Sequence, residues 1–173
     1  GYHEVVQFSF VPKSLIELFP NECEAIEICN PVNSEFSYMR TNVLQSLVMA
    51  AQHNYQRQMK QFKLFEVGQS FQLINNKILE QTQLAAICVG NSARGYGNRV
   101  CTVDYYDMQS LALGLLAKHG MESITITDSL HPALHPKQSC RLMYQGSVVG
   151  EVGVLHPATS KALSLPEAAL LIL

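Results

Sequence analysis

The chain has 173 residues, which is enough for one compact domain with its own hydrophobic core. Apolar residues make up 47% of it and charged residues 15%, the balance of a globular protein and not of a disordered one. The formal net charge of −2 lacks the strongly basic character of an autonomous nucleic-acid-binding domain.

Membrane and export signals are absent from the sequence. No apolar run approaches the ~20 residues that a membrane-spanning helix needs, and no basic segment followed by an apolar one opens the chain. The five cysteines stand far apart, their number is odd and no CxxC occurs, which favours reduced thiols. We therefore expect a cytoplasmic protein without a membrane partner.

Both ends of the chain break off beside a predicted strand. The sequence begins with "GYHEVVQFSF" and stops in the apolar run "AALLIL". Because a natural chain seldom ends on an unprotected strand edge, we interpret residues 1–173 as a single domain cut from a longer protein.

The first quarter of the chain predicts two strands and a short helix. Residues 4–11 are β-branched and aromatic, which is typical of a strand. Residues 13–19 predict one or two helical turns. Residues 24–29 alternate between apolar and polar side chains and predict a second strand, which Pro31 prevents from continuing.

A long helix follows, with Thr41 or Asn42 as its N-cap. One face carries a regular apolar stripe, formed by Leu44, Leu47, Val48, Ala51 and Tyr55. Val43 and Met49 lie off that stripe. We therefore expect the helix to be covered twice, once by its own sheet and once by another surface.

The remainder of the chain is rich in hairpins. A strand over 61–73 turns at Asn75-Asn76 into 77–80, and a further strand over 81–90 precedes a loop over 91–98. A helix begins at an N-cap on Asp107 and ends at Gly120. Strands over 123–127, 140–144 and 147–155, a short helix over 160–165 and a strand over 168–173 follow. This order predicts an α+β domain, an antiparallel sheet flanked by helices.

Glu66 is the most informative ionisable residue, because on a two-residue period it shares a strand face with Phe62 and Leu64. A carboxylate buried without a partner is costly. We predict that Arg40, just before the long helix, is that partner, since its guanidinium suits a partly buried carboxylate. In the alternative arrangement Arg40 reaches a partner subunit and Glu66 accepts from local backbone N–H groups.

No catalytic or metal-binding pattern stands out. The spacing of His131 and His135 could suit a zinc pair on a helix, but a proline follows each histidine and breaks the helix. Cys140 and His135 are close in sequence without a nucleophile motif. We assign no catalytic residue and no metal ligand.

Six sequence blocks, in order, resemble the catalytic-like module of the beta subunit of bacterial phenylalanyl-tRNA synthetase. They are "GYHEVVQFSF", "NPVNSEFSYMRTNVLQSL", "KLFEVGQSF", "VDYYD", "HPKQS" and "VVGEVGVLHP". The chain departs from the family at Asn42 and Gln45-Ser46, where Ser and Pro-Gly are usual, and at Lys137-Gln138, where Gly-Arg is usual. Any role of that arginine is therefore lost in this chain, but these departures do not change the fold that the resemblance implies.

The resemblance implies a class II aminoacyl-tRNA synthetase-like fold without catalytic residues. In this family the alpha subunit performs aminoacylation and binds ATP and magnesium, so no cofactor is expected in this segment. The beta-subunit version of this fold packs against the alpha subunit in an (αβ)2 assembly. tRNA is bound by the holoenzyme as a whole. The Gly-x-Gly-x-Gly-x-x-Arg motif, whose arginine would hold ATP, is missing.

The resemblance also assigns roles to individual residues. The residues expected at the subunit interface are Asn30, Pro31, Met39, Arg40, Thr41, Val43 and Met49. Those expected to be structural are Glu66, Gly68, His156 and Pro157. Two other functions remain open at this point: an independent small enzyme with a pocket near His135 and His156, or a stand-alone RNA-binding module.

Overall fold

The computed structural model describes residues 1–20, 23–31, 33–94, 99–129, 131–166 and 168–173. A seven-stranded sheet forms the centre, in the order β1-β4-β5-β11-β10-β9-β8. Its strands are β1 (His3–Glu4), β4 (Phe62–Ile74), β5 (Lys77–Val89), β8 (Thr125–Asp128), β9 (Leu134–Tyr144), β10 (Ser147–Leu155) and β11 (Ala168–Ile172). Every pair is antiparallel except β1 with β4. The predicted α+β class is confirmed.

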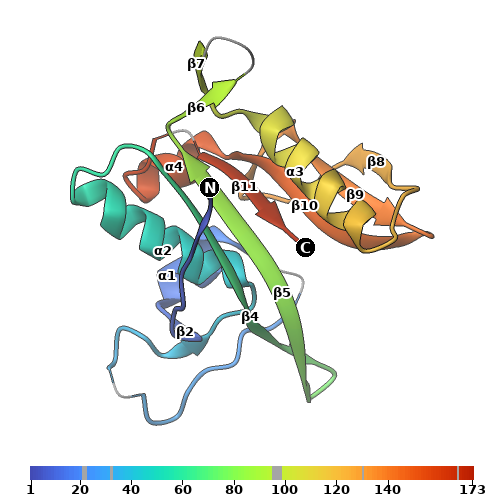
Figure 1. Ribbon diagram of the computed structural model, residues 1–173. Coiled ribbons are helices and arrows are strands. Elements are labelled where there is room, and N and C mark those ends of the chain that lie inside the picture. Colours follow the sequence, from blue (N-terminus) through green and yellow to red (C-terminus); the bar gives the residue numbers. More distant parts are fainter. Residues whose placement is uncertain (21–22, 32, 95–98, 130, 167) are drawn as a thin grey trace.

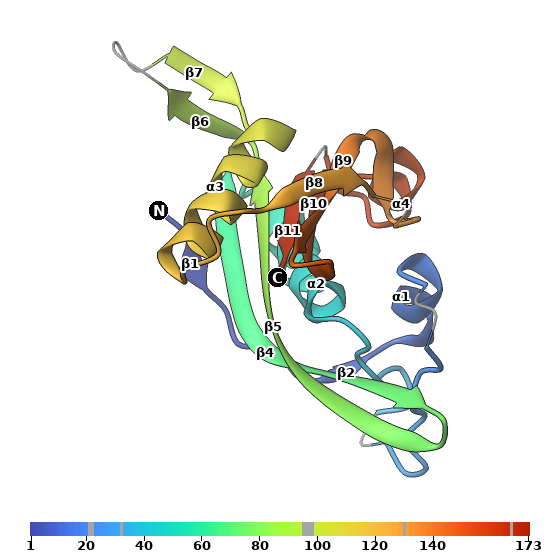
Figure 2. The ribbon, with the colours of Figure 1, turned by 90° about the vertical axis from the view of Figure 1, so that its right-hand side faces the viewer.

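Helices cover both faces of this sheet (Figure 1). The helix α2 (Val43–Gln56) packs on one face together with α1 (Lys13–Leu18) and the segment after α4 (Pro157–Ala162). The helix α3 (Tyr105–Lys118) packs on the other face, as Figure 2 shows. Along β5, Ala85 and Ile87 therefore belong to the first core and Ala86 and Cys88 to the second. Covering on both faces explains the continuous apolar run in this strand.

The hairpin between β4 and β5 extends well beyond the body of the sheet (Figure 2). Asn75 and Asn76 turn it with φ of +49° and +60°, the left-handed pair that a two-residue hairpin turn requires. The predicted turn is confirmed, but β5 runs without a break from Lys77 to Val89 where two strands were predicted.

Several predicted boundaries were wrong. Residues 4–11 contribute only the ends of an extended segment, β1 and β2 (Phe10–Val11), the latter paired with β3 (Tyr38–Met39). Residues 24–29 form only isolated bridges at Glu24 and Glu27. Both segments meet β4 for only a residue or two, through the pair Glu4–Phe65 and the bridge Glu24–Leu73, so neither forms a long strand.

Residues 91–98 were predicted as a loop. Residues 91–94 instead form β6 (Asn91–Arg94), which pairs with β7 (Arg99–Thr102), and residues 95–98 lie outside the described part. The N-cap of α3 is Asp104 and not Asp107. Asp104 accepts from the Asp107 backbone N–H at 3.1 Å, and Asp107 accepts from the Asp104 N–H at 3.0 Å. This reciprocal capping box satisfies two backbone donors at once.

The strand β11 occupies the interior of the sheet, between β5 and β10. The premise that "AALLIL" forms an unprotected edge was therefore wrong. Its register places Leu170 opposite Ile87 on one side and opposite Gly153 on the other. None of the helices in the described part of the chain is both long and apolar enough to cross a membrane.

Candidate functional site

The first turns of α2 are buried in the protein. Asn42, one of the two predicted candidates, caps the helix by accepting from the Leu44 backbone N–H at 2.7 Å. Gln45 accepts from the Thr41 N–H at 2.9 Å and donates to the Thr41 hydroxyl at 3.0 Å. These bonds satisfy polar groups that would otherwise be buried unpaired. These bonds hold the backbone just before the helix in one position, and they thereby position Arg40.

Arg40 and Glu66 form a buried ion pair, which confirms the prediction. The Arg40 Nη1 atom lies 2.6 Å from Glu66 Oε1, and each side chain is only 3% exposed. The sequence pattern had placed Glu66 on the buried face of its strand, and Phe62 and Leu64 on that face are buried as well.

Further hydrogen bonds surround this pair. Arg40 donates through Nε to the Gln69 carbonyl at 2.8 Å and through Nη1 to the Ser46 hydroxyl at 2.6 Å. Ser46 in turn donates to Glu66 Oε2 at 3.3 Å or to the Val43 carbonyl at 3.0 Å. Because the pair is nearly inaccessible to solvent and its groups are used internally, the arrangement suits fixing the fold and not reacting with a substrate.

Gly68 has no side chain, and the Arg40 guanidinium occupies the space that a side chain would fill. A Cβ atom at this position would clash with the Arg40 guanidinium and would lie 3.2 Å from Glu66 Oε1. The absence of a side chain here lets the guanidinium lie against the strand. Gly68 therefore has a steric role in the described structure.

The expected interface residues are not on one surface. Arg40, Thr41 and Val43 are 2%, 1% and 0% exposed, so in this chain they pack inside and present no surface to a partner. Val43 belongs to the core beneath α2 although it lies off the helical stripe, and the same cluster includes Val11 of β2. Their assignment to the subunit interface stays a prediction.

The other four expected interface residues remain accessible. Asn30 is exposed, and Pro31, Met39 and Met49 are half-buried. Asn30 and Pro31 line one groove, whereas Met49 lines a separate cavity between α1 and α2. Met39 pairs across the small sheet with Phe10.

A second ion pair was missed by the sequence analysis. Arg141 Nε donates to Glu151 Oε1 at 2.7 Å across β9 and β10, and Glu151 is 9% exposed. The sequence signal for this pair was the position of the two opposite charges, which stand at nearly equal sequence separations from the Gln145-Gly146 hairpin turn. A bulge in β10 shifts the strand register by one residue, so simple counting from the turn does not pair them. His131 lies nearby, in the same cavity of about 510 Å³.

Burial lowers the pKa of His131 below its usual value, and Arg141 lowers it further while Glu151 opposes the shift. The ring is therefore neutral near pH 7. Its Nδ1 atom accepts from the Ala133 backbone N–H at 3.2 Å. Within the described part of the chain, no three histidine, cysteine, aspartate or glutamate side chains gather in a way that could hold a metal ion.

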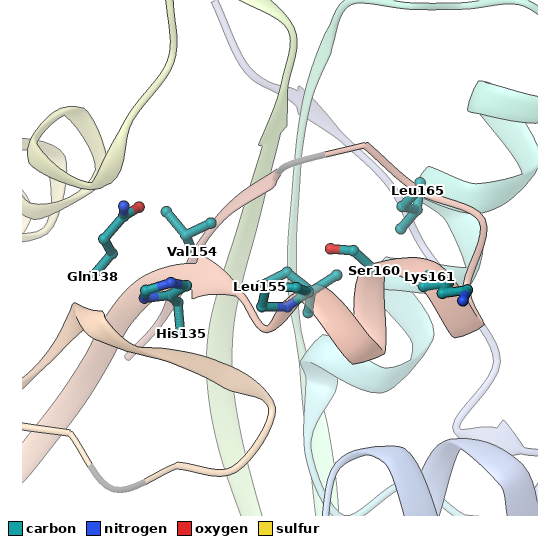
Figure 3. A pocket seen from close by; sticks show the side chains of 8 residues that line it. His135, Gln138, Val154, Leu155, Ser160, Lys161 and Leu165 are labelled. Carbon is teal, nitrogen blue, oxygen red and sulfur yellow. The ribbon is translucent and has the colours of Figure 1, made fainter.

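The pocket expected near His135 and His156 contains only the first of them. Figure 3 shows His135 and Gln138 on one side of a cavity of about 500 Å³ and Ser160 and Lys161 of α4 on the other. His156 instead caps α4, with its Nδ1 atom accepting from the Ala158 N–H at 3.2 Å, and Pro157 takes the first helical turn. The two histidines therefore do not converge on one reaction centre.

Comparison with known proteins gives a consistent result. The family described as phenylalanyl tRNA synthetase beta chain CLM domain matches residues 1–172. The chain is 34% identical over 167 residues to the phenylalanine–tRNA ligase beta subunit of Pseudomonas putida, a match covering 95% of this chain and 21% of the relative. The beta subunit of Legionella pneumophila (strain Lens) is 32% identical over 168 residues, which is 96% of this chain and 21% of the relative. The chain thus spans about a fifth of the length of these curated relatives.

A solved structure shares the fold. The pyrrolysyl tRNA synthetase of Desulfitobacterium hafniense superposes with a TM-score of 0.71 at 12% identity, covering 99% of this chain and 59% of the other. At this identity the likeness concerns the fold alone. It confirms the synthetase-like sheet flanked by helices that was predicted.

Proposed function

Because this chain belongs to the family of the phenylalanyl-tRNA synthetase beta chain CLM domain, we propose that it is a structural and subunit-interface module of a phenylalanine–tRNA ligase. The single observation that carries the proposal is the match of that family over residues 1–172. The curated relatives named as beta subunits of phenylalanine–tRNA ligase, at 32% to 34% identity, support it. In this proposal the module is one part of a longer beta subunit.

The module supports catalysis without performing it. An alpha subunit attaches phenylalanine to its tRNA at the expense of ATP, in an (αβ)2 complex located in the cytoplasm. Two features favour this division of labour. The arginine that would hold ATP is missing from "GEVGVLHP", and the Arg40 guanidinium is engaged by Glu66, Ser46 and the Gln69 carbonyl.

ATP and magnesium belong to the alpha subunit in this proposal. Magnesium is usually bound by carboxylates together with phosphate oxygens. The described residues do not fit such a site, since their carboxylates form no group of metal-ligating geometry and both Glu66 and Glu151 already face an arginine. We derive no step of the reaction through residues of this chain.

Co-purification tests the proposal. The protein at its full expressed length, produced with a tagged alpha subunit, should elute with it as one complex. ATP–pyrophosphate exchange dependent on phenylalanine should appear with the alpha subunit present and be absent without it. Failure to associate with any alpha subunit would overturn the proposal.

The same experiment separates the two other functions. Exchange or hydrolysis of ATP by the chain alone, lost on His135→Ala, would identify an independent enzyme. Binding of tRNA by the chain alone, weakening steeply as salt rises, would identify an RNA-binding module.

A further inference from the structure

A serine of α4 carries a hydroxyl group that is buried and unpaired. In the described part of the chain, the Ser160 Oγ atom is the only buried side-chain nitrogen or oxygen atom without a hydrogen-bond partner. The backbone of this residue is fully used: its N–H donates to the His156 carbonyl at 2.9 Å, and its carbonyl accepts from the Leu165 N–H at 2.9 Å. Burying a hydroxyl without a partner is costly. The Ser160 hydroxyl is therefore available to a bound ligand.

Another buried serine in a helix shows the arrangement that is missing at Ser160. The Ser46 hydroxyl of α2 donates to the Val43 carbonyl at 3.0 Å, within its own helix. Serine hydroxyls in helices commonly bond to a carbonyl three or four residues earlier in this way. The Ser160 hydroxyl makes no such bond and lines a cavity instead (Figure 3).

The cavity has the size and the apolar lining of a small-ligand site. Its volume is about 500 Å³, within the range of pockets that bind small molecules. Val154, Leu155 and Leu165 line it, and these side chains are 3%, 1% and 7% exposed. Their burial means that a rigid part of the core forms this wall, which suits the apolar body of a ligand.

The polar part of the lining supplies hydrogen-bond donors and one positive charge. Figure 3 shows His135 and Gln138 across the cavity from Ser160 and Lys161 of α4. The His135 Nδ1 atom accepts from the Lys137 backbone N–H at 3.2 Å, which places the ring hydrogen on Nε2. No described hydrogen bond uses that Nε2 atom. None of the described lining residues is acidic, so the cavity favours a negatively charged group.

We propose that this cavity binds a small organic carboxylate, with the carboxylate group at Ser160 and Lys161 and an apolar body against the buried wall. One lysine ammonium group balances a single negative charge, which favours a carboxylate over a phosphate dianion. The lining offers no carboxylate to pair with an ammonium group, which disfavours a free amino acid. This inference goes beyond the proposed function, which uses none of these side chains, and does not depend on it.

Calorimetric titration of the protein at its full expressed length tests the inference. The probe is hexanoate, which joins a carboxylate to an unbranched apolar chain. Norleucine adds an ammonium group to the same carbon skeleton, and hexylamine replaces the carboxylate by an ammonium group. Amide hydrogen exchange over residues 157–165, followed by mass spectrometry, locates the bound probe within the protein.

We expect hexanoate to bind with a dissociation constant of about 1 mM or tighter, as is usual for a ligand of this size. It should slow hydrogen exchange over residues 157–165, because binding stabilises the closed form of that segment. Norleucine and hexylamine should bind at least about fivefold more weakly, since their ammonium groups find no acidic partner.

Three variants assign the roles of the polar groups. Ser160→Ala should weaken hexanoate binding about tenfold or more, because it removes a hydrogen bond to a charged group. Without hexanoate it should leave hydrogen exchange over residues 157–165 no faster than in the parent, since the hydroxyl bonds nothing in the described chain. Lys161→Gln should weaken binding about fivefold. Lys137→Gln is the matched control: this exposed lysine does not line the cavity, so binding should stay within about twofold.

Three outcomes would overturn the inference. Hexanoate at about 10 mM could produce neither heat nor protection of residues 157–165. Norleucine and hexylamine could bind as well as hexanoate, which would make the cavity a merely apolar one. Ser160→Ala without hexanoate could exchange faster than the parent over residues 157–165, which would make an internal water the partner of the hydroxyl. None of these outcomes bears on co-purification with an alpha subunit, so the proposed function is tested separately.

Discussion

Removing Arg40 should strongly destabilise the domain, because Glu66 is left with a buried and uncompensated charge. The two side chains are 3% exposed and their charged atoms lie 2.6 Å apart. Breaking such a pair from one side typically costs about 3–5 kcal/mol. For a domain of this size, that loss corresponds to a fall of roughly 6–20 °C in the thermal midpoint.

A double-mutant cycle measures the coupling directly. Arg40→Ala, Glu66→Gln and the double variant of the 173-residue chain are unfolded in urea and followed by circular dichroism. We expect the double variant to lose at least about 1 kcal/mol less than the sum of the single losses. Arg141→Ala serves as the matched control and should cost less, since solvent reaches the Arg141 side chain, which is 35% exposed. Strict additivity, or a negligible loss for Arg40→Ala, would refute the reasoning.

Three further predictions follow from single positions. Gly68→Ala should lower the urea midpoint of unfolding, because the new Cβ atom clashes with the Arg40 guanidinium. Gly114→Ala on α3 is the control: its Cβ atom meets nothing within 4 Å, so the change should raise the free energy of unfolding by about 0.5–1 kcal/mol. Burial lowers the pKa of His131 in the folded state, so the unfolded chain binds more protons just below pH 6.5 and stability falls there on acidification. His131→Gln should flatten that part of the stability-versus-pH curve, and an unchanged slope would count against it. Burial raises the pKa of the Cys88 thiol to about 11, so iodoacetamide at pH 8 should label exposed Cys29 and spare Cys88, as mass spectrometry would show.

The sequence was sufficient where a local pattern and the tertiary structure agree. The Asn42 cap, the Asn75-Asn76 turn and the Arg40–Glu66 pair each follow from short-range rules on capping, turn conformation and the cost of a buried charge. The position of β11 does not follow from such rules, because it depends on which distant strands accept it as a neighbour.

Two errors concern positions where more than one local arrangement is acceptable. Val43 lies off the stripe of its helix and was expected to be accessible, but it is fully buried in the same core cluster as Val11 of β2. In "VDYYD" both aspartates can cap a helix, and Asp104 takes the N-cap while the preceding Val103 donates its backbone N–H to the Gly90 carbonyl at 3.0 Å. For Val43 the sequence does not show which distant residues cover the helix start, whereas the Asp104 cap is explained locally by its reciprocal capping box with Asp107.

The buried pair and the extended segment over residues 5–10 are parts of one arrangement. Glu66 Oε1 contacts both the Arg40 guanidinium and the Gln7 N–H, and the Arg40 backbone N–H holds the Ser9 carbonyl. A buried ion pair does not by itself imply net stabilisation, since apolar replacements can be as stable. It does fix geometry, because each polar atom of the pair needs a partner at a defined place. Here those partners include the Gln7 backbone N–H, so the pair ties the extended segment before β2 to the start of α2 and to β4. Arg40 therefore organises the start of α2 together with the neighbouring strand β4.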